Sequence, residues 1–184
     1  MDVAQEPHPT VILAEDEASL YLQATRQSVW ALQGQTPTVR VDAGRIKTHF
    51  YGTLNLITGQ ELAMQADKMN AATSAQHLEQ ILQTYPSQNI LLFWDRAPWH
   101  QGAAIRRLLE ANPRLEVLKF PVAAPELNPQ EHVWKATRCA VSHNHNEPKL
   151  PGLADRFEQH LKTNQFRSSF LDRYGYTSIR PMFN

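Results

Sequence analysis

The sequence predicts an α/β protein in which helices flank a mixed β-sheet. "TVILAEDE" reads as a short buried strand, and residues 45–69, with the turn signal Thr58-Gly59, read as a β-hairpin. After residue 70 the apolar residues change from alternation to helical spacing, and helices then alternate with two more strands. Paired early strands followed by alternating helices and strands are typical of a mixed sheet between helices. A length of 184 residues favours one compact domain.

In the first half of the chain, the first strand is expected to end at the acids Glu15 to Glu17. A loop and a short strand are expected to follow it. A helix is predicted in "TSAQHLEQILQTYP", with Thr73 and Gln76 as a capping box and Pro86 as its stop. "NILLFWD" is a continuous apolar run, typical of a strand in the middle of a parallel sheet that is covered on both faces.

In the second half of the chain, the sequence predicts a helix that ends at Asn112-Pro113, a strand in "LEVLKFPV", and a helix from about Pro129 to Ser142. Asn128 is the expected N-cap of the latter, with Pro129 at its first position. The apolar stripe of that helix is expected to be buried and consists of Val133, Trp134, Thr137, Ala140 and Val141. A last amphipathic helix carries Leu153, Phe157 and Leu161.

Composition limits the class of protein. No apolar run is long enough to span a bilayer, and the start "MDVAQEPHPT" lacks the pattern of a secretory signal. The net charge is zero, from 18 Lys plus Arg against 18 Asp plus Glu, which argues against nucleic-acid binding by bulk charge alone. It does not exclude a domain whose acids hold metal ions. The single cysteine, Cys139, excludes a disulfide framework, indicates an intracellular protein and is expected to be packed as an apolar residue.

Three acids stand where the chain changes direction: Asp16, Asp95 and Glu131. The carboxyl ends of parallel strands lie at one edge of a sheet, where sites in α/β proteins form. Carboxylate oxygens suit Mg²⁺, and two such ions support phosphodiester chemistry. The acids therefore fit a nuclease or strand-transfer enzyme.

Each acid also has a structural interpretation, and spacing alone favours it. Asp16 can be one of three solvated acids, although alternation separates it from Glu15 and Glu17. Asp95 can cap the turn before Pro98, and Glu131 can complete a capping box. Lys135 and Arg138 share the helix face of Glu131. They suit a phosphate backbone beside a metal, and they suit ordinary ion pairs one turn apart equally well.

Four segments carry a family resemblance: "EDEASLYLQ", "FYGTLNLITG", "WDRAPWH" and "FPVAAPELNPQEHVWKATR". Together they resemble the catalytic domain of DDE transposases, in the bacterial insertion-sequence branch of the mariner superfamily. The resemblance covers residues 11–176 and leaves a flexible N-terminus, 1–10, and a C-terminal tail, 177–184. It implies an RNase H-like fold with a mixed five-stranded sheet. It also implies a metal-binding triad of Asp16, Asp95 and Glu131, with Mg²⁺ or Mn²⁺, two ions in all.

The activity that the resemblance implies is DNA cleavage at transposon ends and strand transfer into target DNA, usually at TA. His100 matches a family histidine, either as a catalytic or phosphate contact or as a hydrogen-bonded loop residue. Arg96 replaces a common Asn and can contact DNA phosphate or pair with a catalytic acid. Asn128 and Trp134 are assigned to capping and to the core. His143 and His145 are read as a polar loop rather than as Zn²⁺ ligands.

The expected partners follow from the same resemblance. Such transposases normally begin with helix-turn-helix domains, and nothing before residue 11 is long enough for one, so we expect an upstream reading frame or another chain to supply it. A homodimer and a cytoplasmic, nucleoid-associated location without a membrane are also expected. Two alternatives remain. One is a non-catalytic remnant that keeps the fold as a DNA- or protein-binding domain, and the other is a different RNase H-like nuclease such as a resolvase.

Overall fold

A computed structural model of the chain describes residues 9–39, 44–122 and 127–166. The predicted tail, 177–184, and all but two residues of the predicted N-terminal segment, 1–10, lie outside the described residues. Among the described residues, no helix is long and apolar enough to cross a membrane.

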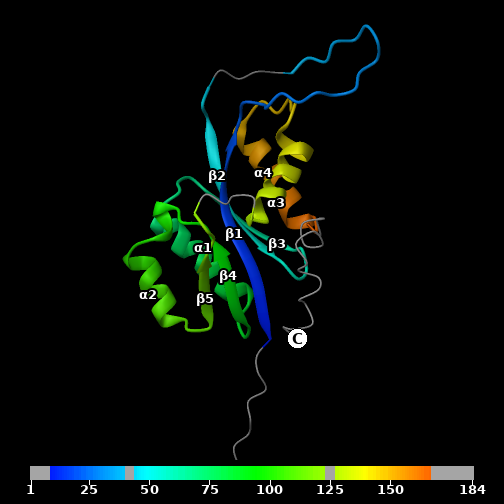
Figure 1. Cartoon of the computed structure of the whole chain (residues 1–184). Helices are drawn as coiled ribbons and strands as arrows, with labels where there is room; N and C mark the ends of the chain where they lie inside the picture. Colours follow the sequence, from blue (N-terminus) through cyan, green and yellow to red (C-terminus); the bar gives the residue numbers. More distant parts are fainter. Residues whose placement is uncertain (1–8, 40–43, 123–126, 167–184) are drawn as a thin grey trace, which may run out of the picture.

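Five strands form one sheet in the order β3-β2-β1-β4-β5 (Figure 1). The strands are β1 (Thr10–Tyr21), β2 (Lys47–Asn55), β3 (Glu61–Ala66), β4 (Asn89–Trp94) and β5 (Leu115–Lys119). β1, β2 and β3 pair antiparallel in sequence, whereas β4 runs parallel to both β1 and β5. The predicted hairpin and the predicted mixed five-stranded sheet are therefore confirmed.

Helices cover both faces of this sheet (Figure 1). They are α1 (Ala71–Thr84), the 3-10 turn η1 (Pro98–His100), α2 (Ala103–Ala111), α3 (Gln130–Thr137), the π-helical turn η3 (Arg138–Ser142) and α4 (Leu150–Thr163). α3 and α4 pack with one face of the sheet in a cluster that includes Ala14, Trp134 and Phe157. α1 and α2 pack with the other face in a second cluster that includes Leu13 and Ile81.

β1 is longer than expected, and this corrects the prediction that the first strand ends at the acids Glu15 to Glu17. β2 pairs with β1 as far as Tyr21, and Asp16 lies opposite Gly52 in this register. The unbroken pairing satisfies the backbone groups of the acidic stretch, so the strand continues through it. Alternation then sends Asp16 to the α3 side of the sheet, and Glu15 and Glu17 to the α1 side.

The central position of β4 confirms that the apolar run is covered on both faces. Ile90, Leu92 and Trp94 are 1%, 0% and 2% exposed and pack in the cluster with α1 and α2. Phe93 points to the opposite face and packs against the cluster that contains α3 and α4. A strand held between two neighbours and two layers is a rigid support for the residue that follows it.

α1 begins earlier than its predicted capping box. Asn70 is the N-cap, and its Oδ1 accepts hydrogen bonds from the backbone N–H groups of Ala72 and Thr73 at 2.9 and 3.0 Å. Thr73 is therefore inside the helix, and its assignment as the cap was wrong. The predicted stripe of α4 is confirmed, since Leu153, Phe157 and Leu161 are at most 1% exposed.

The start of α3 confirms a capping role for Asn128, whose Oδ1 accepts from the backbone N–H of Gln130 at 3.1 Å. Its end differs from the prediction, because the helix continues as the π-helical turn η3. The wider turn shifts the register of the buried face, so Ser142 is buried with Val141 while Ala140 is exposed. Cys139 is exposed as well, which corrects the expectation of a packed cysteine.

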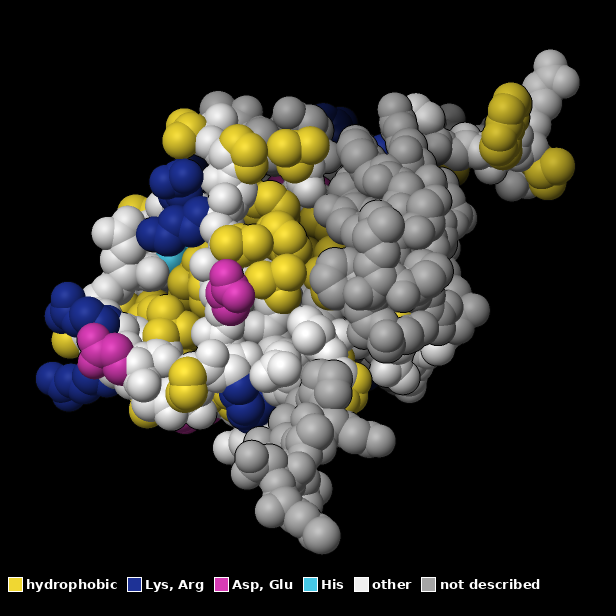
Figure 2. Space-filling model, turned by 60° about the horizontal axis from the view of Figure 1, so that its bottom comes forward, with side chains coloured by type: hydrophobic (Ala, Val, Ile, Leu, Met, Phe, Trp, Pro, Cys, Tyr) yellow, Lys and Arg dark blue, Asp and Glu magenta, His cyan; other side chains and the backbone are white. Residues whose placement is uncertain are grey.

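The charged side chains do not gather on the face where β1 begins. Figure 2 shows hydrophobic side chains in the middle of this face and separate small groups of Lys and Arg toward its margin. This arrangement agrees with the zero net charge of the chain, because the view presents no single dominant basic surface.

Candidate active site

Asp16 lies in the middle of β1 on the face that α3 covers. Its Oδ2 accepts a hydrogen bond of 3.1 Å from the indole Nε1 of Trp134. The pKa of Asp16 is raised to about 7, mainly by burial and in addition by the negative charges of Glu131, Glu17 and Asp95. The charges of Glu131 and Asp95 therefore influence Asp16, but among the described residues only Glu15, Glu17 and His100 have ligand atoms within 4.8 Å of one another.

Asp95 follows directly on β4, and its side chain is 47% exposed. Its Oδ1 accepts from the backbone N–H of Ala97 at 2.7 Å and lies 2.9 Å from Nδ1 of His100. The hydrogen bond from His100 is the main reason why the pKa of Asp95 lies below its ordinary value, despite the opposing effect of burial. The carboxylate thus caps the turn before Pro98, as its structural interpretation expected, and is also ionised at the edge of the sheet.

Glu131 stands in the first turn of α3 and is exposed. Its carboxylate makes no hydrogen bond or ion pair with the described residues, so the return bond of a capping box is not formed there. Glu131 instead lines an open pocket of about 380 Å³ together with His132, Lys135, Arg138 and His143. Lys135 of α3 and Arg138 of η3, the two predicted cationic residues, therefore line the same pocket as the third acid.

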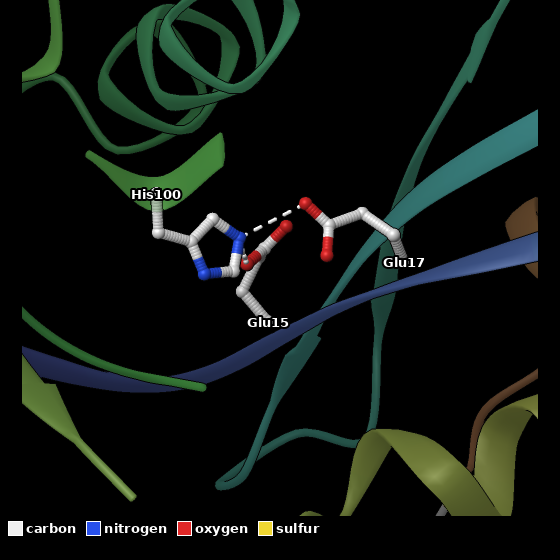
Figure 3. Close-up of side chains that lie close together, drawn as sticks. All are labelled: Glu15, Glu17 and His100. Atoms are coloured by element: carbon white, nitrogen blue, oxygen red, sulfur yellow. Dashed lines mark hydrogen bonds and ion pairs between the residues drawn. The ribbon is translucent and has the colours of Figure 1, made fainter. Parts of the chain in front are cut away.

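A second acidic group lies on the opposite face of β1, where His100 of η1 points between Glu15 and Glu17 (Figure 3). His100 is 3% exposed. Its Nε2 lies 2.9 Å from Oε1 of Glu17 and 3.5 Å from Oε2 of Glu15, and Trp99 Nε1 donates to the same Glu17 oxygen at 2.7 Å. The imidazole also stacks on Trp94, with 4.3 Å between ring centroids.

This second group contains one cation for its two carboxylates, and burial and the charge of Glu17 raise the pKa of Glu15. Burial lowers the pKa of His100, but its hydrogen bonds with Asp95 and Glu17, and the charge of Glu15, raise it to about 10. The ring is then an imidazolium, and both its nitrogens donate to carboxylates. One atom from each of Glu15, Glu17 and His100 lies within 4.8 Å of the others, which also suits a metal ion. Because an imidazolium has no lone pair for a metal, we interpret the group as a buried ion cluster.

The remaining predicted contacts have different surroundings. His100 is buried and hydrogen-bonded, which favours that interpretation over a phosphate contact. Arg96 is exposed, and its Nε donates to the carbonyl oxygen of Phe120 at 3.1 Å. Within the described part of the chain it forms no ion pair with any of the three predicted acids. The ring of His145 accepts from the backbone N–H of Glu147 at 3.1 Å, in keeping with a polar loop.

The three predicted acids have the donor atoms that suit a divalent metal ion. Asp16, Asp95 and Glu131 offer carboxylate oxygens, which are the ligands that Mg²⁺ and Mn²⁺ prefer. In the described residues, neither Asp16 nor Glu131 has a cationic partner, and their mutual repulsion contributes to the raised pKa of Asp16. A bound cation would relieve this repulsion, as happens when metal ions invert the local effects on pKa.

The sequence pointed to Asp16, Asp95 and Glu131 but missed the group around Glu15 and Glu17. The available signal was the alternation Glu15-Asp16-Glu17 within an extended segment, which separates the outer acids from the middle one. It also missed the bond from Trp134 to Asp16, because an apolar stripe at helical spacing indicates only that the indole is buried.

The order of the strands and the helices on both faces of the sheet define an RNase H-like fold. The solved structures described below share this fold. The chain belongs to the DDE superfamily endonuclease family, which matches residues 11–152. This confirms the predicted family. The C-terminal limit of the domain at residue 176 stays a prediction.

Among curated proteins, the chain is 24% identical over 164 residues to an insertion element IS630 uncharacterized 39 kDa protein of Shigella sonnei. The match covers 89% of this chain and 47% of that protein. Among solved structures, the Mos1 transposase paired-end complex with left transposon end is 20% identical, with a TM-score of 0.66, and covers 88% of this chain and 50% of that one. The mariner Mos1 paired-end complex with Mg is 19% identical, with a TM-score of 0.66 and coverage of 94% and 55%. The chain thus spans about half the length of these relatives.

Proposed function

We propose that this chain is the catalytic part of a transposase that cleaves DNA at transposon ends and joins the freed end to target DNA. One observation carries the proposal: the chain belongs to the DDE superfamily endonuclease family, and the negative charges of Glu131 and Asp95 both raise the pKa of Asp16. In a chain of the DDE superfamily endonuclease family, Asp95 held by His100, together with Asp16 and Glu131, which have no cationic partner among the described residues, fits metal-dependent phosphodiester chemistry.

The residues Asp16, Asp95 and Glu131 would hold Mg²⁺ or Mn²⁺, and the Mos1 complexes with Mg and with Mn are relatives in fold. When two ions are bound, they activate the attacking oxygen and stabilise the leaving oxygen of the phosphodiester. His100 keeps Asp95 ionised through its bond to Oδ1 and holds the carboxylate in place. The rigid position of β4 between β1 and β5 keeps Asp95 at the edge of the sheet.

DNA is the proposed substrate, and the pocket beside Glu131 is the proposed place of its backbone. Lys135 and Arg138 line that pocket with Glu131, so they can neutralise phosphates next to the carboxylates. Arg96 is exposed near the end of β4 and is a further candidate for a phosphate contact. The proposed target preference for TA depends on the family alone.

We also propose two protein partners: a helix-turn-helix part that reads the transposon ends, and a second copy of the chain. The segment between β1 and β2 extends away from the sheet (Figure 1). It presents Val29, Trp30 and Leu32 at 55%, 104% and 72% exposure, and such apolar side chains commonly lie at contacts between proteins. A homodimer would cover them. Replacing Trp30→Ala and measuring the mass by analytical ultracentrifugation with element-end DNA tests this.

The activity is tested with element-end DNA and the helix-turn-helix part supplied. We expect Mg²⁺-dependent nicking and strand joining by the natural chain, with a loss of at least about 100-fold in Asp95→Asn, since one ligand carboxylate is removed. Asp67→Asn, a change on the exposed turn after β3, is the matched control and keeps full activity. Full activity of Asp95→Asn would exclude the metal triad.

The non-catalytic alternative is separated by thermal melting with and without Mn²⁺. A ligand that binds only the folded chain raises its melting temperature, by an amount equivalent to about 2.7 kcal/mol at 100 times the dissociation constant. The transposase proposal expects this rise and its loss in Asp16→Asn. Equal melting temperatures with and without Mn²⁺ would favour the remnant.

A further inference from the structure

Trp134 links α3, which carries Glu131, to β1, which carries Asp16. It stands three residues after Glu131 on α3, is 1% exposed, and donates its indole N–H to Oδ2 of Asp16 at 3.1 Å. A buried indole N–H normally finds a hydrogen-bond acceptor, and in Trp134 that acceptor is the carboxylate of the first predicted acid. The bond therefore also restrains the carboxylate that accepts it.

Gly52 provides the space in which the indole lies. It is the partner of Asp16 in the β1–β2 register. A Cβ atom at this position would stand 2.5 Å from Cη2 of Trp134 and 2.3 Å from the side-chain nitrogen of Gln130, which real Cβ atoms do not tolerate. Only a glycine lets these two side chains of α3 cross β2 so closely. The crossing brings the indole N–H to Asp16.

Two further contacts hold α3 in place beside the indole. Gln130 Nε2 donates to Oε1 of Glu61 on β3 at 2.5 Å, and Gln130 is fully buried. The ring of Phe157 on α4 lies 6.4 Å from that of Trp134, at an angle of 17° between their planes. Side chains locked by packing and hydrogen bonds hold their donors in one orientation, as a site that must be preorganised requires.

We propose that Trp134 is a positioning residue for metal binding: its N–H fixes one oxygen of the Asp16 carboxylate and thereby its rotation toward the shared site. This inference rests on the proposed function and deepens it. A carboxylate with one oxygen held by a buried donor presents the other in a defined direction. Hydrogen bonds of this kind to ligand side chains commonly change metal affinity by about 10- to 100-fold.

The test replaces one atom of Trp134 in the full-length chain. Incorporation of 3-benzothienylalanine at position 134 substitutes sulfur for the ring N–H and keeps the shape of the side chain. Mn²⁺ binding, measured by titration calorimetry and by the electron paramagnetic resonance of free Mn²⁺, is expected to weaken by about 10-fold or more. Trp134→Phe is expected to weaken it similarly and serves as a second variant of natural composition.

The matched control separates positioning from packing. Leu161→Ala removes apolar volume from the same core cluster and leaves the indole and Asp16 untouched, because Leu161 lies on α4. It is expected to lower the melting temperature and to leave the Mn²⁺ affinity within twofold. Equal losses of affinity in Leu161→Ala and in the sulfur variant would overturn the positioning role.

The outcomes also distinguish this inference from the proposed function. If the natural chain binds Mn²⁺, Asp16→Asn does not, and the sulfur variant binds as tightly as the natural chain, then the positioning role is wrong and the proposed function stands. If the natural chain and Asp16→Asn bind Mn²⁺ equally, or neither binds it, the proposed metal site is wrong and the role of Trp134 falls with it.

Discussion

On one face of β1, Glu15 and Glu17 lie beside the imidazolium of His100, whereas on the other face Asp16 accepts a hydrogen bond from the indole of Trp134. Glu15, Asp16 and Glu17 are consecutive residues of a single strand, and burial and neighbouring carboxylates raise the pKa of both Glu15 and Asp16. They differ in that Glu15 and Glu17 have a cation, His100, beside them. Asp16 has no such cation among the described residues, so an added cation would relieve the repulsion from its neighbours.

The difference indicates which of two acidic groups is the candidate metal site. By distance alone, Glu15, Glu17 and His100 form the tighter group, with one atom of each within 4.8 Å of the others. Distance does not decide the matter, because a protonated histidine has no lone pair to offer a metal ion. The lack of a cation beside Asp16 among the described residues is the more informative observation.

The largest expected effect comes from removing the cation. His100→Ala leaves the buried Glu15 and Glu17 unpaired, which should lower the free energy of unfolding at pH 7 by about 3–5 kcal/mol, as measured by urea denaturation. Glu17→Gln in the His100→Ala background removes one of the repelling charges and should restore part of the loss. No recovery in the double variant would show that packing against Trp94, not charge, explains the effect.

The contribution of His100 also predicts a pH dependence. Its pKa is raised in the folded chain from 6.5 to about 10. The stabilisation is therefore fully present below pH 6.5 and is lost as the pH rises toward 10. Urea denaturation between pH 6 and 10 should show this decline in the natural chain, and a weaker decline in His100→Ala.

The next effect has the opposite sign. The pKa of Asp16 is raised from 3.8 to about 7, so its ionisation costs stability as the pH rises through this interval. Without metal at pH 8, Asp16→Asn should therefore increase the free energy of unfolding, by up to about 4 kcal/mol for a shift of this size. At pH 3 the two proteins should be nearly equal, which is the internal control. A less stable Asp16→Asn at pH 8 would contradict the difference between the two faces.

A smaller effect is expected at Gly52, where α3 packs against β2. Gly52→Ala places a methyl group against Gln130 and Trp134, which should cost about 1–3 kcal/mol in unfolding free energy. Gly152→Ala is the matched control, since its new methyl group would meet mainly the flexible side chain of Glu147. A helical Gly→Ala change there should be neutral or stabilising. Equal losses in both variants would remove the special role of Gly52.

The smallest effect on stability is expected on the outer face of α3. Lys135 is exposed, so Lys135→Gln should change the free energy of unfolding by less than about 0.5 kcal/mol. It should also weaken binding to element-end DNA and reduce the dependence of log affinity on log salt by about 1. Glu79→Gln on the exposed face of α1 is a control of the opposite charge. An unchanged salt dependence in Lys135→Gln would exclude a phosphate contact.

Local pattern determined much of the fold. The hairpin of β2 and β3, the apolar run of β4 and the stripe of α4 each have a periodicity that suits one element, so they were predicted correctly. Errors arose where a local rule had two solutions. Thr73 resembles a cap, but Asn70 comes first and accepts both backbone N–H groups. The register of the buried face changes in η3, which exposes Cys139, and no periodicity announces a π-helical turn.

The sequence by itself determined the family of the chain and the three acids of the proposed site, because short motifs around Asp16, Asp95 and Glu131 carry that information. Only the tertiary structure decided the surroundings of each acid. Whether a carboxylate meets the imidazolium of His100 or the indole of Trp134 depends on elements more than 80 residues away along the chain. Charge balance and hydrogen bonding act through space, so a strand of alternating acids acquires two different faces only when the sheet is covered.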